Sequence, residues 1–128
     1  YDPGRMTFFS WTGVTHYLPV KAIHDTLRDI TGMSGSGSEI VFDYWDKSAF
    51  DPEKASKRIK SLIASTRSIS EPIITGFDSG ALEAELSVLG LRLVENLGPD
   101  EIKRRYLSSC GGGYSASEHV HLACALVK

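Results

Sequence analysis

A run of polar side chains follows the most aromatic segment near the start of the chain. Residues 12–17 offer hydroxyl groups, an imidazole and a glycine: Thr12, Gly13, Thr15, His16 and Tyr17. Hydroxyl and imidazole groups can bind and orient a polar substrate, and a glycine lets a ligand approach the backbone closely. We expect this segment to lie just beyond the carboxyl end of a strand, where open parallel sheets bind their ligands. A loop that caps a helix is the alternative for the same composition.

Two glycine-rich stretches lie in the wrong context for phosphate binding. Residues 35–37 (Gly-Ser-Gly) follow a predicted helix and open a strand, whereas a nucleotide-binding loop follows a strand and opens a helix. The triple glycine at 111–113 likewise follows a predicted helix and precedes a predicted strand, and we interpret it as a flexible loop. The basic run at 103–105 follows Asp100 and Glu101 on a predicted helix, so a solvated face that complements the helix dipole explains it.

The histidines and cysteines of the second half do not form a recognisable site. His119 and His121 would project from the same face of a strand, a spacing that can supply two metal ligands. No further Cys, His or Asp cluster completes a ligand set, so we predict structural histidines and no metal. Cys110 and Cys124 lack a CxxC spacing and a nearby base. We expect Cys110 to be accessible and Cys124 to be a small core residue.

The elements that position residues 12–17 follow from the apolar pattern. Aromatic and β-branched runs predict strands at 6–11, 39–45, 91–97 and 119–127. Strand 6–11 is rich in aromatic and β-favouring residues, and we interpret it as a strand buried on both faces. Helices are predicted from Pro19 to Gly32, after Pro52, after a cap at Asp78-Ser79, and from about 99 to 107. Their predicted inward residues are Val20, Ile23, Leu27 and Ile30; Ala55, Ile59, Leu62 and Ile63; and Leu82, Leu86 and Leu89.

The connections between these elements predict an α/β fold. A helix joins the first two strands, which suits a parallel crossover unit. Only a short helix and a loop join the last two strands, so we expect those to be antiparallel. The chain has 128 residues, which is the usual size of a single domain, so we predict one domain (1–128).

Composition narrows the possible functions. Fourteen basic and sixteen acidic residues give a net charge of −2, which argues against a dedicated nucleic-acid or anionic-membrane binder. No apolar run approaches the roughly 20 residues that a membrane helix needs. Two cysteines make no disulfide framework, so we expect a reducing, cytoplasmic compartment. The chain opens at Tyr1, almost directly on a strand, and we expect it to be a piece of a longer protein.

Residues 8–19, FFSWTGVTHYLP, resemble the fourth-strand pattern FFxxEGVxxYL of the leucine carboxyl methyltransferase type of class I S-adenosylmethionine-dependent methyltransferases. That family includes bacterial and archaeal O-methyltransferases. The similarity continues through residues 37–44, 71–77, 89–97 and 121–125, so it covers nearly the whole chain. The acidic residue that precedes the glycine in the family pattern is Thr12 in this chain.

The resemblance implies a partial Rossmann-like methyltransferase sheet flanked by helices, containing the strands that a full enzyme would number four, five, seven and six. It implies S-adenosylmethionine as the methyl donor of the complete enzyme, with Trp11, Thr12 and Gly13 as cofactor-binding residues. It also implies catalytic roles for Tyr17 and His16 toward a small-molecule acceptor that offers a carboxylate or a hydroxyl. The part of the family fold that binds most of the donor has no counterpart in this chain, so we expect little activity from it alone.

The same resemblance implies an open sheet edge. In the family the fourth strand lies against the first strand, so strand 6–11 would here present an apolar edge that should pair with something. We expect either self-association, for instance as a dimer, or pairing with a missing N-terminal half. The alternative function is a non-catalytic α/β interaction module that assembles through this edge, and the Thr12 difference favours it.

Overall fold

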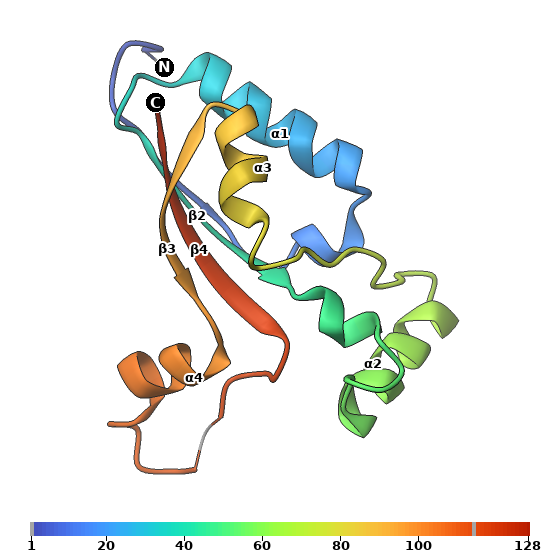
Figure 1. Ribbon diagram of the computed structural model, residues 1–128. Helices are drawn as coiled ribbons and strands as arrows, with labels where there is room; N and C mark the ends of the chain where they lie inside the picture. Colours follow the sequence, from blue (N-terminus) through green and yellow to red (C-terminus); the bar gives the residue numbers. More distant parts are fainter. Residues whose placement is uncertain (1, 114) are drawn as a thin grey trace.

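The computed structural model describes residues 2–113 and 115–128 (Figure 1). In chain order its elements are β1 (Phe8–Trp11), η1 (Thr15–Tyr17), α1 (Val20–Met33), β2 (Glu39–Trp45), η2 (Lys47–Phe50), α2 (Lys57–Ser68), α3 (Leu82–Val88), β3 (Leu91–Leu97), α4 (Pro99–Ile102), η3 (Lys103–Leu107) and β4 (Val120–Val127). The elements η1 and η2 are 3-10 turns, and η3 is a π-helical turn that continues α4.

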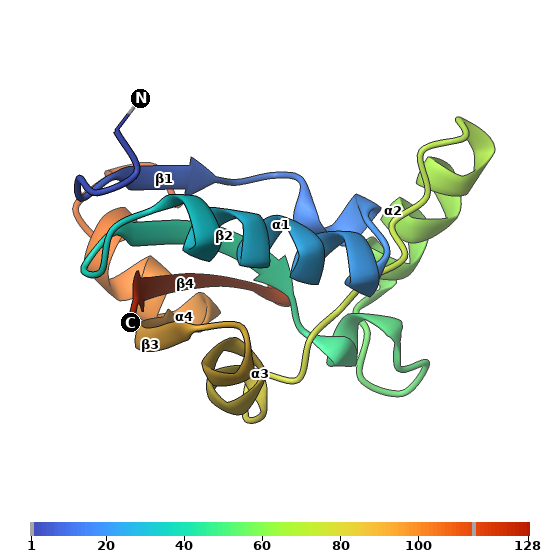
Figure 2. The same cartoon turned by 90° about the horizontal axis from the view of Figure 1, so that it is seen from above.

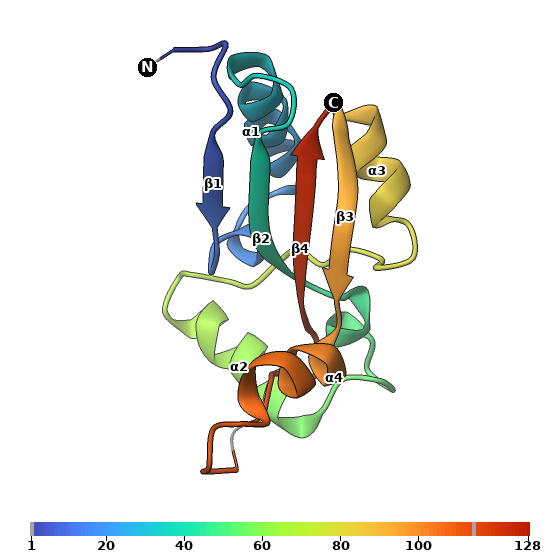
Figure 3. The same cartoon turned by 90° about the vertical axis from the view of Figure 1, so that its left-hand side faces the viewer.

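The four strands form one mixed sheet in the spatial order β1-β2-β4-β3. Strands β1 and β2 are parallel, with Ser10 opposite Val41, while β4 is antiparallel to both β2 and β3. Three strands therefore point the same way and β4 runs against them, as Figure 3 shows. This arrangement confirms the predicted parallel pair, the antiparallel final pair and the expected strand order of four, five, seven and six.

Helices α1 and α3 cover one face of the sheet, which we call the inner face (Figures 1 and 2). The predicted stripe of α1 is buried there at Ile23, Leu27 and Ile30, whereas Val20 in the first turn is exposed. Leu82, Leu86 and Leu89 are buried as predicted, and Gly90 ends the helical segment with a φ of +86°. The inner core further contains Ile40, Phe42, Tyr44, Phe77, Leu91, Ala123, Ala125 and Val127.

A second, smaller core lies under α2. It consists of Trp45, Ala49, Ala55, Ile59 and Ile73. Helix α2 begins later than predicted, at Lys57, because the Ser56 hydroxyl accepts a 3.2 Å hydrogen bond from the Ile59 amide and caps the helix there. Leu62, predicted to face inward, is 41% exposed. Only one narrow side of α2 packs against the rest of the molecule, so fewer of its apolar residues are buried than the sequence suggests.

Two further burial predictions, for Phe8 and Cys124, are wrong, and the outer face of the sheet explains both. We call outer the face that α1 and α3 leave uncovered, and Figure 3 looks onto it. Phe8 of β1 is 62% exposed, because β1 is a sheet edge and no described element covers its outer face; only Phe9 and Trp11 pack on the core. Cys124 lies half-buried on the outer face of β4 rather than in the core.

Two local features complete the fold. Helix α3 begins at Leu82 and not at the predicted Asp78-Ser79 cap, because the Asp78 carboxylate accepts the Gly80 amide in a tight turn before the helix. Arg105 on η3 forms a 2.8 Å ion pair with Glu95 on the surface, as expected of a solvated basic run.

In the described part of the chain no helix is both long and apolar enough to cross a bilayer.

Candidate functional site

The candidate site lies at the carboxyl ends of β1 and β2. Both strands point toward η1 and toward α2, which lies beyond that edge of the sheet in two views (Figures 2 and 3). Residues 12–17, which we call the β1 loop, follow β1 directly and contain η1. The prediction that this segment lies just past the carboxyl end of a parallel strand is therefore confirmed.

Asp43 of β2 holds the β1 loop in place. Its carboxylate Oδ1 accepts a 2.7 Å hydrogen bond from the Gly13 amide, and its backbone carbonyl accepts one of 2.7 Å from the Thr15 hydroxyl. Thr15 is almost fully buried, so this second contact satisfies a polar group that would otherwise be costly. Sequence analysis missed Asp43, although a charged residue inside the apolar run 39–45 was a usable signal.

Gly13 gives the loop an open backbone. Its φ of +76° lies in the left-handed region, which favours glycine. No heavy atom lies within 4 Å of the position that a Cβ would take there. The Gly13 backbone is thus accessible to a ligand, while the neighbouring Thr12 side chain is exposed and Trp11 packs partly against the core.

His16 is a buried residue of the loop. Its ring packs 4.1 Å from the Tyr17 ring and 5.3 Å from the Trp45 ring, measured between centroids. Its Nδ1 is buried and finds no hydrogen-bond partner among the described residues. Burial lowers the pKa of His16, an effect that the nearby Asp43 charge partly offsets. The imidazole is therefore neutral at neutral pH.

Tyr17 lines an open cleft of about 390 Å³, which we call the Tyr17 cleft. Its other lining residues, Ser70, Glu71 and Pro72, come from the turn that follows α2. Tyr17 is 40% exposed, so it presents ring surface to this space. In the sequence, Glu71 and Pro72 were noted only as part of the resemblance at residues 71–77; their position beside Tyr17 is a tertiary feature.

Hydrogen bonds join the two walls of this cleft. The amides of Ile74 and Thr75 both donate to the His16 carbonyl, at 2.8 and 3.2 Å. The buried Thr75 hydroxyl donates a 2.5 Å hydrogen bond to the Leu18 carbonyl. Segments more than fifty residues apart are therefore fixed to one another at the site.

The remaining candidate histidines have structural contacts. His119 Nδ1 lies 2.9 Å from the Ser48 hydroxyl, and His121 stacks on the Tyr44 ring at 5.2 Å. The Asp46 carboxylate accepts a hydrogen bond from the Ser48 amide and so caps η2, and it also accepts one from the Ser79 amide. Within residues 2–113 and 115–128, no three His, Cys, Asp or Glu side chains gather closely enough to hold a metal ion.

The sheet order, with its antiparallel strand between β2 and β3, matches part of the α/β fold of solved S-adenosylmethionine-dependent methyltransferases. Among solved structures, a DUF574-family protein from Streptomyces avermitilis superposes with a TM-score of 0.68 at 15% identity, over 100% of this chain and 47% of that one. The O-methyltransferase NcsB1 of neocarzinostatin biosynthesis, solved with S-adenosyl-L-homocysteine and 1,4-dihydroxy-2-naphthoic acid, superposes with a TM-score of 0.54 at 12% identity, over 94% of this chain and 29% of that one.

A sequence relative carries a related name. The chain is 30% identical over 135 residues to the Bacillus subtilis protein named "Putative S-adenosyl-L-methionine-dependent methyltransferase YktD". The match covers all of this chain and 44% of YktD, so the chain spans less than half the length of this relative. No established protein-family profile matches the chain. The assignment to the leucine carboxyl methyltransferase type stays a prediction.

Proposed function

We propose that the chain supplies the acceptor-side half of an S-adenosylmethionine-dependent O-methyltransferase. The single observation that carries this proposal is the β1 loop at the carboxyl end of β1, fixed by Asp43 and open at Gly13, in a methyltransferase fold. Ligands bind at this edge of open α/β sheets. The name of the YktD relative supports the same class of reaction.

In this proposal Trp11, Thr12 and Gly13 contact the methyl donor. When bound, the donor supplies a methyl group on a sulfonium sulfur. The residues present fit one side of such a ligand, because Gly13 has open backbone and Thr12 has an exposed hydroxyl. Methyl transfer depends chiefly on alignment, so residues that position the two reactants matter more than strong acids or bases.

Tyr17 and His16 face the acceptor in the same proposal. A carboxylate acceptor is already ionised and needs no general base, whereas a hydroxyl acceptor gains from one. The neutral imidazole of His16 has the protonation state that a base requires. His16 is buried beside the Tyr17 ring, so it can act as a base on an acceptor only when the loop opens; in the described conformation Tyr17 is the exposed one of the two. The hydroxylated aromatic bound by the NcsB1 neighbour supports a hydroxyl acceptor.

The partner in this proposal is the donor-binding half of the fold. Strand β1 has one described neighbour, β2. Its first residue Phe8 is 62% exposed, and Met6, two residues before the strand, is 77% exposed. Unpaired strand edges of this kind bind other strands. We propose that β1 pairs with a strand of the donor-binding half, and that the chain alone has little activity.

Donor binding tests the proposal. We would titrate S-adenosylhomocysteine calorimetrically into the 128-residue chain, and into the same chain expressed with the polypeptide encoded immediately upstream. We expect micromolar binding by the longer protein and none by the chain alone. Micromolar binding by the chain alone would contradict the half-site proposal. A folded longer protein that binds no donor would favour the non-catalytic interaction module, which the Thr12 difference and the exposed β1 edge support.

A further inference from the structure

The Tyr17 cleft contains a carboxylate that the proposed methyl transfer does not use. Glu71 lines the cleft together with Tyr17, Ser70 and Pro72, and the space of about 390 Å³ is large enough for a single-ring ligand. The cleft thus combines an aromatic ring, a proline ring, hydroxyl groups and one negative charge.

The shape of the cleft is fixed by the fold. The Glu71 amide donates to the Thr66 carbonyl at the end of α2, and the His16 carbonyl accepts the amides of Ile74 and Thr75. Ser70 has a φ of +62°, a left-handed conformation that non-glycine residues seldom adopt and that a surrounding structure must impose. The Glu71 side chain therefore extends from a backbone held on both sides, so a ligand has to order only the side chain and not the loop.

The Glu71 charge is available to a ligand. Among the residues that the structure describes, no Lys, Arg or His nitrogen lies within 4.0 Å of the Glu71 carboxylate. An unpaired carboxylate at the wall of a cleft attracts a hydrogen-bond donor, most strongly a protonated amine, and repels a second carboxylate.

We infer that the Tyr17 cleft binds a flat apolar molecule that carries a hydrogen-bond-donating end group toward Glu71, and that it discriminates against carboxylates. Tyr17 and Pro72 provide the apolar contact, and Glu71 is the specificity-determining residue. The assignment of the cleft to the acceptor rests on the proposed function. If that function holds, the cleft is the acceptor subsite, and the acceptor is a hydroxyl or amine compound and not a carboxylic acid.

Three small probes with the same phenol ring test this inference on the 128-residue chain. Tyramine carries a protonated amine, 4-ethylphenol is neutral and 4-hydroxyphenylacetate is an anion. We would titrate each into the ¹⁵N-labelled chain and follow the amide resonances. We expect tyramine to bind most tightly and the anion most weakly, with the largest shifts at Tyr17, Ser70 and Glu71.

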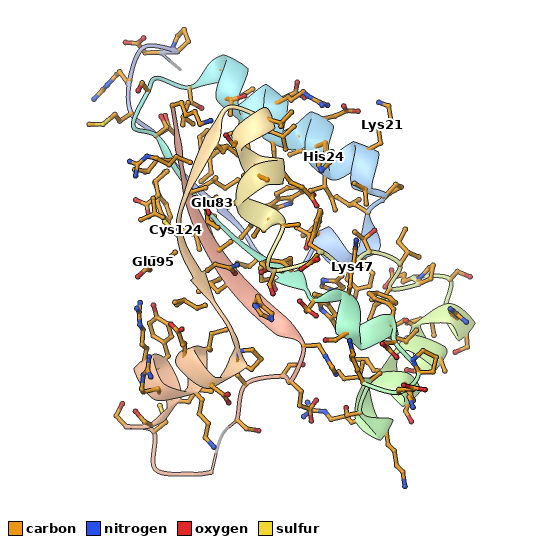
Figure 4. The ribbon with its side chains drawn as sticks, in the orientation of Figure 1. Lys21, His24, Lys47, Glu83, Glu95 and Cys124 are labelled. Carbon is orange, nitrogen blue, oxygen red and sulfur yellow. The ribbon has the colours of Figure 1, made fainter. Side chains whose placement is uncertain are left out.

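Two variants test whether tyramine binding depends on the Glu71 charge itself or on the loss of any surface carboxylate. Glu71→Gln should weaken tyramine binding about threefold to tenfold and leave 4-ethylphenol unchanged, because one charge-assisted contact is lost while the shape is kept. The matched control Glu83→Gln removes an exposed carboxylate from α3, outside the cleft, and should change neither probe (Figure 4).

Several outcomes would overturn the inference. These are equal binding of all three probes, shifts centred away from the cleft, no detectable binding of tyramine, or a Glu71→Gln variant that binds tyramine as the original chain does. The amide spectrum of each variant reports whether it is folded. None of these outcomes bears on donor binding, which the calorimetric titration measures separately, so the two proposals can fail independently.

Discussion

The amide of Gly13 donates a 2.7 Å hydrogen bond to Oδ1 of Asp43, thirty positions later in the chain. The contact joins the loop after β1 to the neighbouring strand β2. It also orients the one loop residue whose backbone adopts a left-handed φ. The conformation of the β1 loop is therefore set by a side chain of the adjacent strand as well as by its own sequence.

Replacing Asp43 should destabilise the fold by a small, measurable amount. Asp43→Ala removes the carboxylate that accepts the Gly13 amide, and we expect the free energy of unfolding to fall by about 1 kcal/mol. Urea unfolding followed by circular dichroism measures the change. The control Asp29→Ala, at an exposed position of α1, should alter the free energy by less than about 0.5 kcal/mol. Equal effects of the two substitutions would show that the Asp43 contact does not stabilise the loop.

The order of strands and helices could be predicted from the sequence, because the spacing of apolar residues follows the periodicity of the local backbone. The run at 39–45 and the stripe at Ile23, Leu27 and Ile30 both became buried elements. The position of the β1 loop followed from the order of elements alone. The burial of Phe8 was predicted wrongly, since an apolar run does not reveal whether a strand has a neighbour and a helix on each side.

The candidate site was only partly predictable. Its β1 loop is contiguous in sequence and carries an unusual set of polar residues. Asp43 and Glu71 reach the loop through strand pairing and through the hydrogen bonds between residues 16–18 and 74–75, which no local pattern encodes. Such contacts between distant segments become visible only when the chain is folded.

Stability should fall as the pH drops below neutrality. Burial lowers the pKa of both His16 and His121 from the ordinary value of 6.5. The unfolded chain then binds more protons than the folded chain, so the stabilisation is present above about pH 6.5 and is lost as the pH falls toward the folded-state values. Urea unfolding at about pH 7.5 and about pH 5.5 measures this.

His121→Phe provides the corresponding control. It keeps a ring on Tyr44 and removes one titrating group, so the pH dependence should become shallower, by at most about 1.4 kcal/mol per pH unit. Equal or greater stability of the original chain at the lower pH would contradict the assigned direction of both shifts.

The two cysteines should differ strongly in reactivity. Burial and the Glu39 carboxylate, whose Oε1 accepts a 3.0 Å hydrogen bond from the thiol, raise the pKa of Cys124 to about 12. At about pH 8 roughly one Cys124 in ten thousand is then a thiolate, whereas Cys110 is exposed. Peptide mass spectrometry after iodoacetamide treatment should find Cys110 labelled long before Cys124.

The contact with Glu39 can be tested in the same assay. Glu39→Gln should speed labelling of Cys124, because it removes the negative charge beside the thiol, and should leave Cys110 unchanged. Labelling in urea should make the two cysteines similar. Rapid labelling of Cys124 in the folded chain would be inconsistent with its raised pKa.

The isolated chain should self-associate through β1 when its proposed partner half is absent. Phe8 is exposed on this edge strand, so Phe8→Lys should shift the mass measured by light scattering toward the monomer. Val88→Lys, on an 84% exposed position of α3, should leave the mass unchanged. A chain that is monomeric at all concentrations before any substitution would remove this prediction.

In the proposed function the carboxyl end of β1 forms part of a methyl-donor site. The most direct test is an amide NMR titration of the chain, expressed with the polypeptide encoded upstream, with S-adenosylhomocysteine. We predict that the largest shifts within these 128 residues occur at Trp11, Thr12 and Gly13, and that they saturate with the calorimetric affinity. Saturable shifts that leave these three amides unmoved, or that centre on α4 or the outer face of the sheet, would contradict the claim.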